Sequence, residues 1–120
     1  MDIFLTNPDF SPLDATRLEE LLRSDDRFCN VRANLTVGEL LEADYISGTD
    51  AARVALDEQR TALSISWESD LAIVVALLIR DGLGERLRIF DTQYSFDMVI
   101  DDSTALDDLR SAIDTAKAER

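Results

Sequence analysis

A run of apolar residues in the middle of the chain, 71–79, has no polar residue within it and a charged residue on each side. A helix that is apolar all round is buried on most of its sides, and nine residues are far fewer than the about 20 that cross a bilayer. The β-branched residues leave a short buried strand as an alternative. Ser69 as an N-cap, Asp70 near the positive end of the helix dipole, and Gly82 and Gly84 as stop signals favour the helix. We therefore predict a central buried helix that the other elements cover.

The segment 61–68 alternates between apolar and polar residues and is predicted to form a hairpin with 53–57. Leu63, Ile65 and Trp67 fall on one face of this arm, whereas small hydroxyl residues leave the other face flat and open. The pattern is typical of an antiparallel strand with one solvated face. Trp67 stands at the end of the arm and is either a core residue under the central helix or an exposed anchor for a partner.

Weaker patterns predict the remaining elements. Ser11 followed by Pro12 is an N-cap with proline at the first helical position. The stretch 38–50 is the least readable, although its last six residues favour a strand edge that leads into a turn. The other predicted elements are a strand over 2–6, a helix over 12–24, a strand around 31–35, strands over 85–91 and 94–100, and a final helix capped by 101–103.

The predicted order is strand, helix, two or three strands, helix, two strands, helix. One twisted, mostly antiparallel sheet of about five or six strands, with about three helices packed on one face, satisfies this order. The length suits one domain, and no linker, repeat or low-complexity run divides the chain. We therefore predict a single α+β domain over 1–120.

The absence of histidine excludes several chemistries. No Ser-His-Asp triad, Cys-His pair or imidazole metal ligand is possible, and the sequence has no Gly-rich phosphate loop. Catalysis by paired carboxylates remains possible in principle, but a chain of 120 residues gives little room for a cleft around them. We predict a protein that is not an enzyme and uses no cofactor. The single cysteine, Cys29, and the lack of a signal-peptide pattern favour the cytoplasm.

The net charge is strongly negative. Twenty-five acidic residues oppose twelve basic ones, which gives a formal charge of −13. Such a field repels nucleic acid and anionic membranes and speeds encounter with basic partners. Solubility alone is the alternative explanation, but a small domain needs a net charge of only about 2–8 for it. We predict a basic protein partner, with no direct contact to nucleic acid or membrane.

Six aspartates gather within eighteen residues of the C-terminal third of the chain. Clustered carboxylates bind a divalent cation, mimic a phosphate backbone or pair with an arginine-rich surface. They also serve simply to cap a helix and solvate a strand, with the nearby aromatic residues in the core. Our predicted partner-binding residues are Asp91, Tyr94, Asp97, Asp101, Asp102, Asp107 and Asp108, together with Trp67 and Glu68.

The segment 87–97, LRIFDTQYSFD, is followed by a short acidic loop and a C-terminal helix. It resembles the tail of small immunity proteins from bacterial polymorphic toxin systems, the Sit-type immunity proteins among them. The opening strand and leucine-rich helix are similar too, so that the resemblance covers about half of the chain. It implies a cytoplasmic, non-catalytic protein that binds one cognate toxin and occludes its active site, and it carries over no catalytic or contact residue.

Two other binding functions fit the same features. An acidic secretion chaperone for an injected effector has a similar element order once the first strand is set aside, and such chaperones are homodimers. A nucleic-acid mimic would space its carboxylates like phosphates and compete with DNA for its target. We expect an immunity protein that is a monomer or a weak homodimer.

Overall fold

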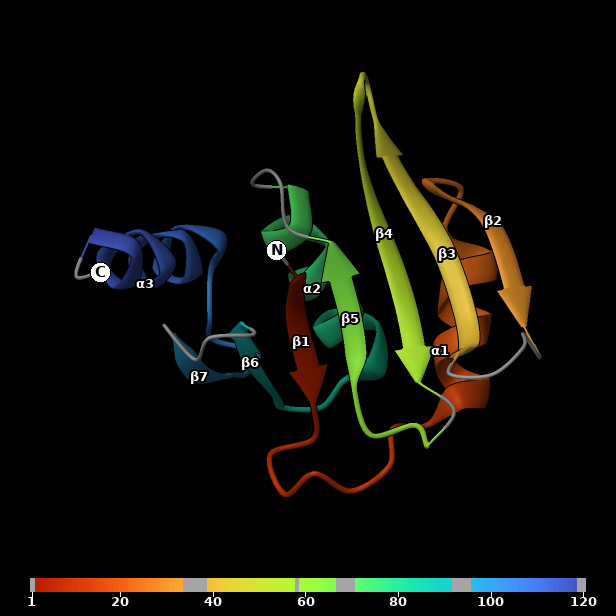
Figure 1. Cartoon of the computed structure of the whole chain (residues 1–120), viewed down its shortest axis with the longest axis horizontal. Coiled ribbons are helices and arrows are strands. Elements are labelled where there is room, and N and C mark those ends of the chain that lie inside the picture. The colour runs from red at the N-terminus through yellow and green to blue at the C-terminus, as the bar shows by residue number, and fades with distance from the viewer. Residues whose placement is uncertain (1, 34–38, 58, 67–70, 92–95, 119–120) are drawn as a thin grey trace.

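The computed structural model describes residues 2–33, 39–57, 59–66, 71–91 and 96–118, which form seven strands and three helices (Figure 1). The elements are β1 (Asp2–Thr6), α1 (Ala15–Ser24), β2 (Phe28–Ala33), β3 (Glu39–Ser47), β4 (Asp50–Asp57), β5 (Leu63–Ser66), α2 (Leu71–Leu83), β6 (Leu87–Asp91), β7 (Asp97–Ile100) and α3 (Leu106–Ala118).

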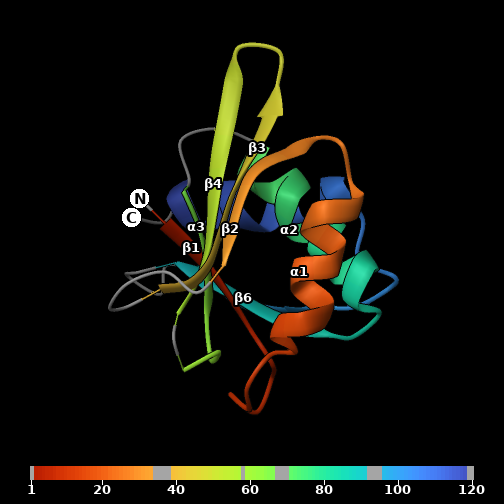
Figure 2. The same ribbon diagram turned by 90° about the vertical axis from the view of Figure 1, so that its right-hand side faces the viewer.

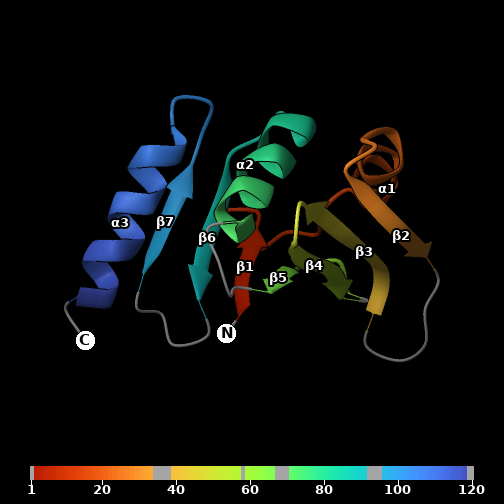
Figure 3. The same ribbon diagram turned by 90° about the horizontal axis from the view of Figure 1, so that it is seen from above.

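The strands form one seven-stranded antiparallel sheet in the order β2-β3-β4-β5-β1-β6-β7. Helices α1 and α2 lie on the same side of this sheet, as the view along it from the β2 edge shows (Figure 2). Helix α3 lies beside β7 at the other end and contacts α2 (Figure 3). The prediction of one α+β domain with an antiparallel sheet and three helices is confirmed, with more strands than expected.

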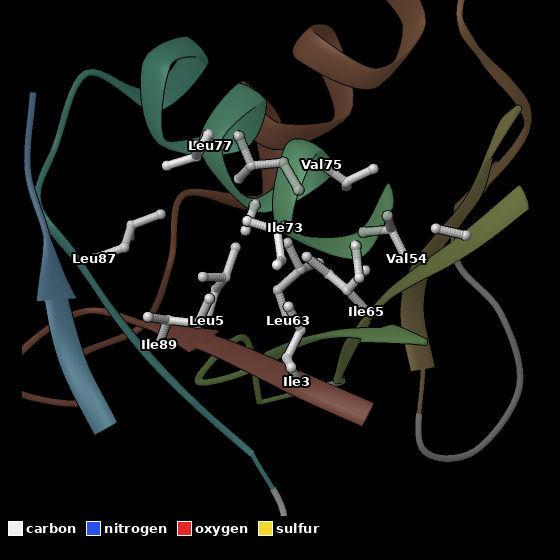
Figure 4. Close-up of a cluster of buried hydrophobic side chains, with 14 of the residues drawn as sticks. Ile3, Leu5, Val54, Leu63, Ile65, Ile73, Val75, Leu77, Leu87 and Ile89 are labelled. Carbon is white, nitrogen blue, oxygen red and sulfur yellow. The ribbon is translucent and has the colours of Figure 1, made fainter. Parts of the chain in front are cut away.

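The core lies between α2 and the inward face of the sheet (Figure 4). Ile3 and Leu5 on β1, and Ile65 on β5, alternate with outward residues and are 0% exposed. Ile73 of α2 packs above them (Figure 4). Burying each such side chain stabilises the fold by about 1.5–3 kcal/mol. The apolar run is therefore a central buried helix, as predicted.

The prediction for the stretch 38–50 was incomplete, because it contains one long strand and the start of another. Strands β3 and β4 form a hairpin in which Ser47 pairs with Asp50 around a two-residue connection. Gly48 has a φ of +62°, a conformation that tight hairpin turns require. The preceding strand, β2, begins at Phe28, earlier than the predicted 31–35, of which 34 and 35 lie outside the described residues.

Several predicted helix and strand ends were wrong. Helix α1 begins at Ala15 with Asp14 as its N-cap, instead of following Ser11. Helix α2 runs through Gly82, and only Gly84, with a φ of +66°, stands at its end. Helix α3 begins at Leu106, beyond the predicted cap at 101–103.

Strand β6 covers only the later part of the predicted 85–91, and β7 covers 97–100 of the predicted 94–100, of which 94 and 95 lie outside the described residues. The predicted cap of α2, Ser69 with Asp70, lies outside the described residues.

Candidate interaction surface

Five of the predicted partner-binding acids follow one another from β7 into α3, at the β7 end of the sheet (Figures 1 and 3). Asp97 stands on β7, Asp101 and Asp102 lie in the connection, and Asp107 and Asp108 occupy the first turn of α3. All are exposed except Asp101, which is half-buried. We call these five residues the β7–α3 acidic edge.

Two carboxylates of this edge accept hydrogen bonds from nearby backbone N–H groups. Asp101 Oδ1 accepts hydrogen bonds from the hydroxyl and the backbone N–H of Ser103, at 2.6 and 2.9 Å, and these bonds lower the pKa of Asp101. Asp108 Oδ2 accepts from the backbone N–H of Ala105 at 3.1 Å, which satisfies a donor at the start of α3. The bond of Asp108 supports the helix-capping explanation for that carboxylate, whereas Asp101 stabilises the turn that precedes α3.

Asp97 is held by a cross-strand arginine. Arg88 Nε donates to Asp97 Oδ1 at 2.7 Å, and a second, parallel bond joins Arg88 Nη2 to Asp97 Oδ2. The hydrogen bonds from Arg88 lower the pKa of Asp97. Asp107 makes a looser ion pair with Arg110 at 3.7 Å, and within the described residues Asp102 makes none. Within the β7–α3 acidic edge, Asp102 and Asp107 are thus the acids whose carboxylates make no short hydrogen bond or close ion pair with the described residues.

The remaining predicted contacts lie elsewhere. Asp91 ends β6 opposite Ile3 and is 0% exposed, so its carboxylate cannot contact a partner directly in this conformation. Alternate side chains of β6 point to the inward face of the sheet, and Asp91 is one of them. The prediction of Asp91 as a partner contact did not take this alternation into account. Trp67, Glu68 and Tyr94 lie outside the described residues.

A group of side chains that was not predicted from the sequence lies on the face of the sheet that carries no helix. Phe4 of β1 and Phe90 of β6 stack there with ring centroids 5.6 Å apart, and the ring of Phe10 lies 6.3 Å from that of Phe90. The guanidinium of Arg88 lies 4.8 Å from the Phe10 centroid, within the range of a cation–π contact. We call Phe4, Phe10, Arg88 and Phe90 the aromatic patch.

One signal in the sequence points to this patch. Phe4 stands between the inward residues Ile3 and Leu5, and Phe90 follows the inward Ile89, so each strand places one large apolar ring on its outward face. A strand that is apolar on both faces is covered on both. Phe90 is only 8% exposed although no helix covers it, and the ring of Phe10 supplies cover from the β1–α1 connection.

A ladder of ion pairs occupies the other half of the same open face, on β2, β3 and β4. The carboxylate of Glu42 pairs with Arg32, and Arg53 Nε lies 3.3 Å from Asp44 Oδ1 and 3.6 Å from Glu42 Oε1. The arginines extend into solvent, whereas Glu42 is buried beneath them. Charges on this half therefore cancel locally.

Two polar hollows lie at the end of the molecule where β1 leads into α1. One, of about 450 Å³, is lined by Arg80, Asp81, Gly84, Glu85, Arg86 and Asp102. The other, of about 490 Å³, is lined by Asn7, Pro8, Asp9, Ser11, Pro12, Asp14, Glu85 and Arg86. Both are shallow and charged rather than apolar, unlike small-molecule sites.

No group of three or more histidine, cysteine, aspartate or glutamate side chains within the described ranges has the geometry to hold a metal ion. None of the helices described is both long enough and apolar enough to span a membrane. No family model, curated protein or solved structure matches this chain.

Proposed function

We propose that this chain is a non-catalytic immunity protein of the cytoplasm that binds a basic toxin or effector domain and blocks its active site. The observation that carries the proposal is the distribution of charge. Seven arginines in the described part of the chain form ion pairs with its own carboxylates: Arg23, Arg27, Arg32, Arg53, Arg80, Arg88 and Arg110. Seven of the twelve basic residues are therefore neutralised within the molecule, while exposed carboxylates such as Asp102 and Asp107 contribute to the formal net charge of −13.

A net negative charge of this size favours a cationic partner in two ways. It accelerates encounter by long-range attraction, and it repels anionic competitors such as nucleic acid. Carboxylates that hold no tight internal bond, such as Asp102 and Asp107, are available for pairing with lysine or arginine around a toxin's active site. Blockade by such contacts needs no catalytic group in this chain, and the resemblance to Sit-type immunity proteins supports the same mechanism.

The proposal is tested by co-expressing this chain with the domain encoded immediately upstream of its gene and isolating the complex. We expect a one-to-one complex, suppression of that domain's toxicity, and an affinity that falls as salt rises from about 50 to about 500 mM, because salt shortens the range of the field. A homodimer of this chain bound to a secreted effector would indicate a chaperone instead. Competition with DNA for a DNA-binding protein would indicate a mimic.

The contribution of the β7–α3 acidic edge is tested by a matched pair of variants. Asp102→Asn with Asp107→Asn removes two charges from this edge without removing the bonds of Asp101 or Asp108. Asp26→Asn with Asp50→Asn removes the same charge from two other exposed positions, one in the α1–β2 connection and one at the start of β4. We expect the first pair to lower affinity more than the second. Equal losses would indicate the overall field alone, and binding unaffected by the first pair would show that this edge is not the contact.

A further inference from the structure

Two of the three most exposed large apolar side chains in the described part of the chain lie close together on the face of the sheet that carries no helix. Phe10 is 44% exposed and Val99 is 43% exposed, and the third, Ile46, is 48% exposed. Val99 stands opposite Arg88 in the β6–β7 register, and the Arg88 guanidinium lies over the ring of Phe10. Phe10, Arg88 and Val99 are therefore neighbours around one arginine, whereas Ile46 lies apart near the tip of the β3–β4 hairpin (Figures 1 and 2).

The loop that carries Phe10 holds this residue in a strained conformation. Phe10 has a φ of +61°, a left-handed conformation that is unfavourable for a residue with a side chain. Its N–H donates to the carbonyl of Asn7 at 2.9 Å, and the Asn7 amide donates to the carbonyls of Ser11 and Pro12, both at 3.1 Å. These bonds tie the two ends of the loop together, and they fix a half-exposed ring on Phe90.

Arg88 is equally preorganised. Both of its bonds to Asp97 and its contacts with the rings of Phe10 and Phe90, at 4.8 and 5.8 Å from their centroids, fix the guanidinium plane. Aromatic residues and arginine are the types that dominate binding energy at interfaces. Because the side chains are already ordered, binding them costs less conformational entropy.

We propose that the patch around Phe10, Arg88 and Val99 is the apolar centre of the interface with the basic protein partner, an inference that rests on the proposed function. At the patch itself Asp97 neutralises Arg88, as suits an interface core, which is depleted in net charge.

The charges beside the patch favour a basic partner over a second copy of this chain. The loop that carries Phe10 contributes the exposed carboxylates of Asp9 and Asp14 and no base. Glu85 and Arg86 line the same hollow, so that three acids there oppose one base. Lysine or arginine at the edge of a basic partner would meet these three carboxylates. A second copy would bring two charges of −13 together, which mutual repulsion disfavours.

The test measures affinity for the upstream-encoded domain by calorimetry, for Phe10→Gly and for the control Ile46→Ala. Glycine adopts a positive φ without strain, so Phe10→Gly removes the ring and relieves the backbone, and a urea titration verifies that it folds. We expect Phe10→Gly to weaken binding about 30-fold, as for a hot-spot residue, Val99→Ala to weaken it less, and Ile46→Ala to leave it within about twofold.

Equal affinity of Phe10→Gly and the wild type, or a larger loss for Ile46→Ala, would overturn the inference while the proposed function stood. Failure of the wild type to bind the domain would overturn both. A wild-type homodimer that Phe10→Gly dissociates, measured by sedimentation, would identify a second copy as the occupant and would also refute the inference.

Discussion

The contact between α1 and α2 provides a sharp test of the packing, because it depends on a glycine. A Cβ atom at Gly82 would lie 2.5 Å from both Cδ atoms of Leu21 and 3.0 Å from its Cγ. Gly82 lies inside α2, where alanine is ordinarily the better residue. The substitution Gly82→Ala therefore improves helix propensity but creates a steric clash. Whether it raises or lowers the free energy of unfolding depends on whether Leu21 is present.

The two effects have comparable size. Alanine in place of glycine stabilises a helix interior by about 1 kcal/mol, whereas overpacking costs about 1–3 kcal/mol. We expect Gly82→Ala alone to lower the free energy of unfolding by about 1 kcal/mol. Leu21→Ala removes all three close atoms. In that background the same change should raise the free energy of unfolding by about 1 kcal/mol, a coupling of about 2 kcal/mol between the positions.

The assay is urea unfolding followed by far-ultraviolet circular dichroism of the wild type, both single variants and the double variant. Gly84→Ala is the control, because its φ of +66° makes alanine strained there, while its nearest atom is Arg17 Nη2 at 3.5 Å. This change should destabilise equally with or without Leu21. A stabilisation by Gly82→Ala of the same size in both backgrounds would refute the close packing of α1 on α2.

Two further predictions concern side chains that bond to the backbone or across strands. Asp14→Ala removes the acceptor of the Arg17 N–H bond, 3.1 Å long, and should lower the free energy of unfolding by about 1 kcal/mol in urea titrations, whereas Ser11→Ala should change it much less. Because Arg88 lowers the pKa of Asp97 in the folded state, this pair contributes stability above the unfolded aspartate pKa of about 4 and loses it as pH falls through the folded value. The stability difference between wild type and Asp97→Asn should therefore shrink between about pH 5 and pH 2; a difference constant over this range would contradict the role of Arg88.

Short-range patterns in the sequence were sufficient for most elements. The unbroken apolar run around Ile73 identified α2, and the alternation of Leu63 and Ile65 identified β5, because each pattern follows directly from the geometry of one helix or strand. The element that was predicted only in part, β3, carries Glu42 among apolar residues. Its carboxylate is acceptable in the sheet only because Arg32 and Arg53 approach it from two other strands.

The acidic edge illustrates the same limit at the level of single side chains. The exposure of the edge could be predicted from the pattern of charge. The sequence did not distinguish Asp101 and Asp108, whose carboxylates accept hydrogen bonds from backbone N–H groups, from Asp102, which accepts none within the described residues. That separation depends on where neighbouring N–H groups point.

The type of each strongly patterned element, the α+β class and the net negative charge could be predicted from the sequence, because they depend on neighbours in the chain or on composition. Only the folded structure shows that β1 lies between β5 and β6, so that Phe4 stacks on Phe90. Only it brought Phe10 and Arg88 together on that face. Strand pairing and side-chain stacking join residues far apart in the sequence, and local periodicity carries no information on which distant strand a given strand will meet.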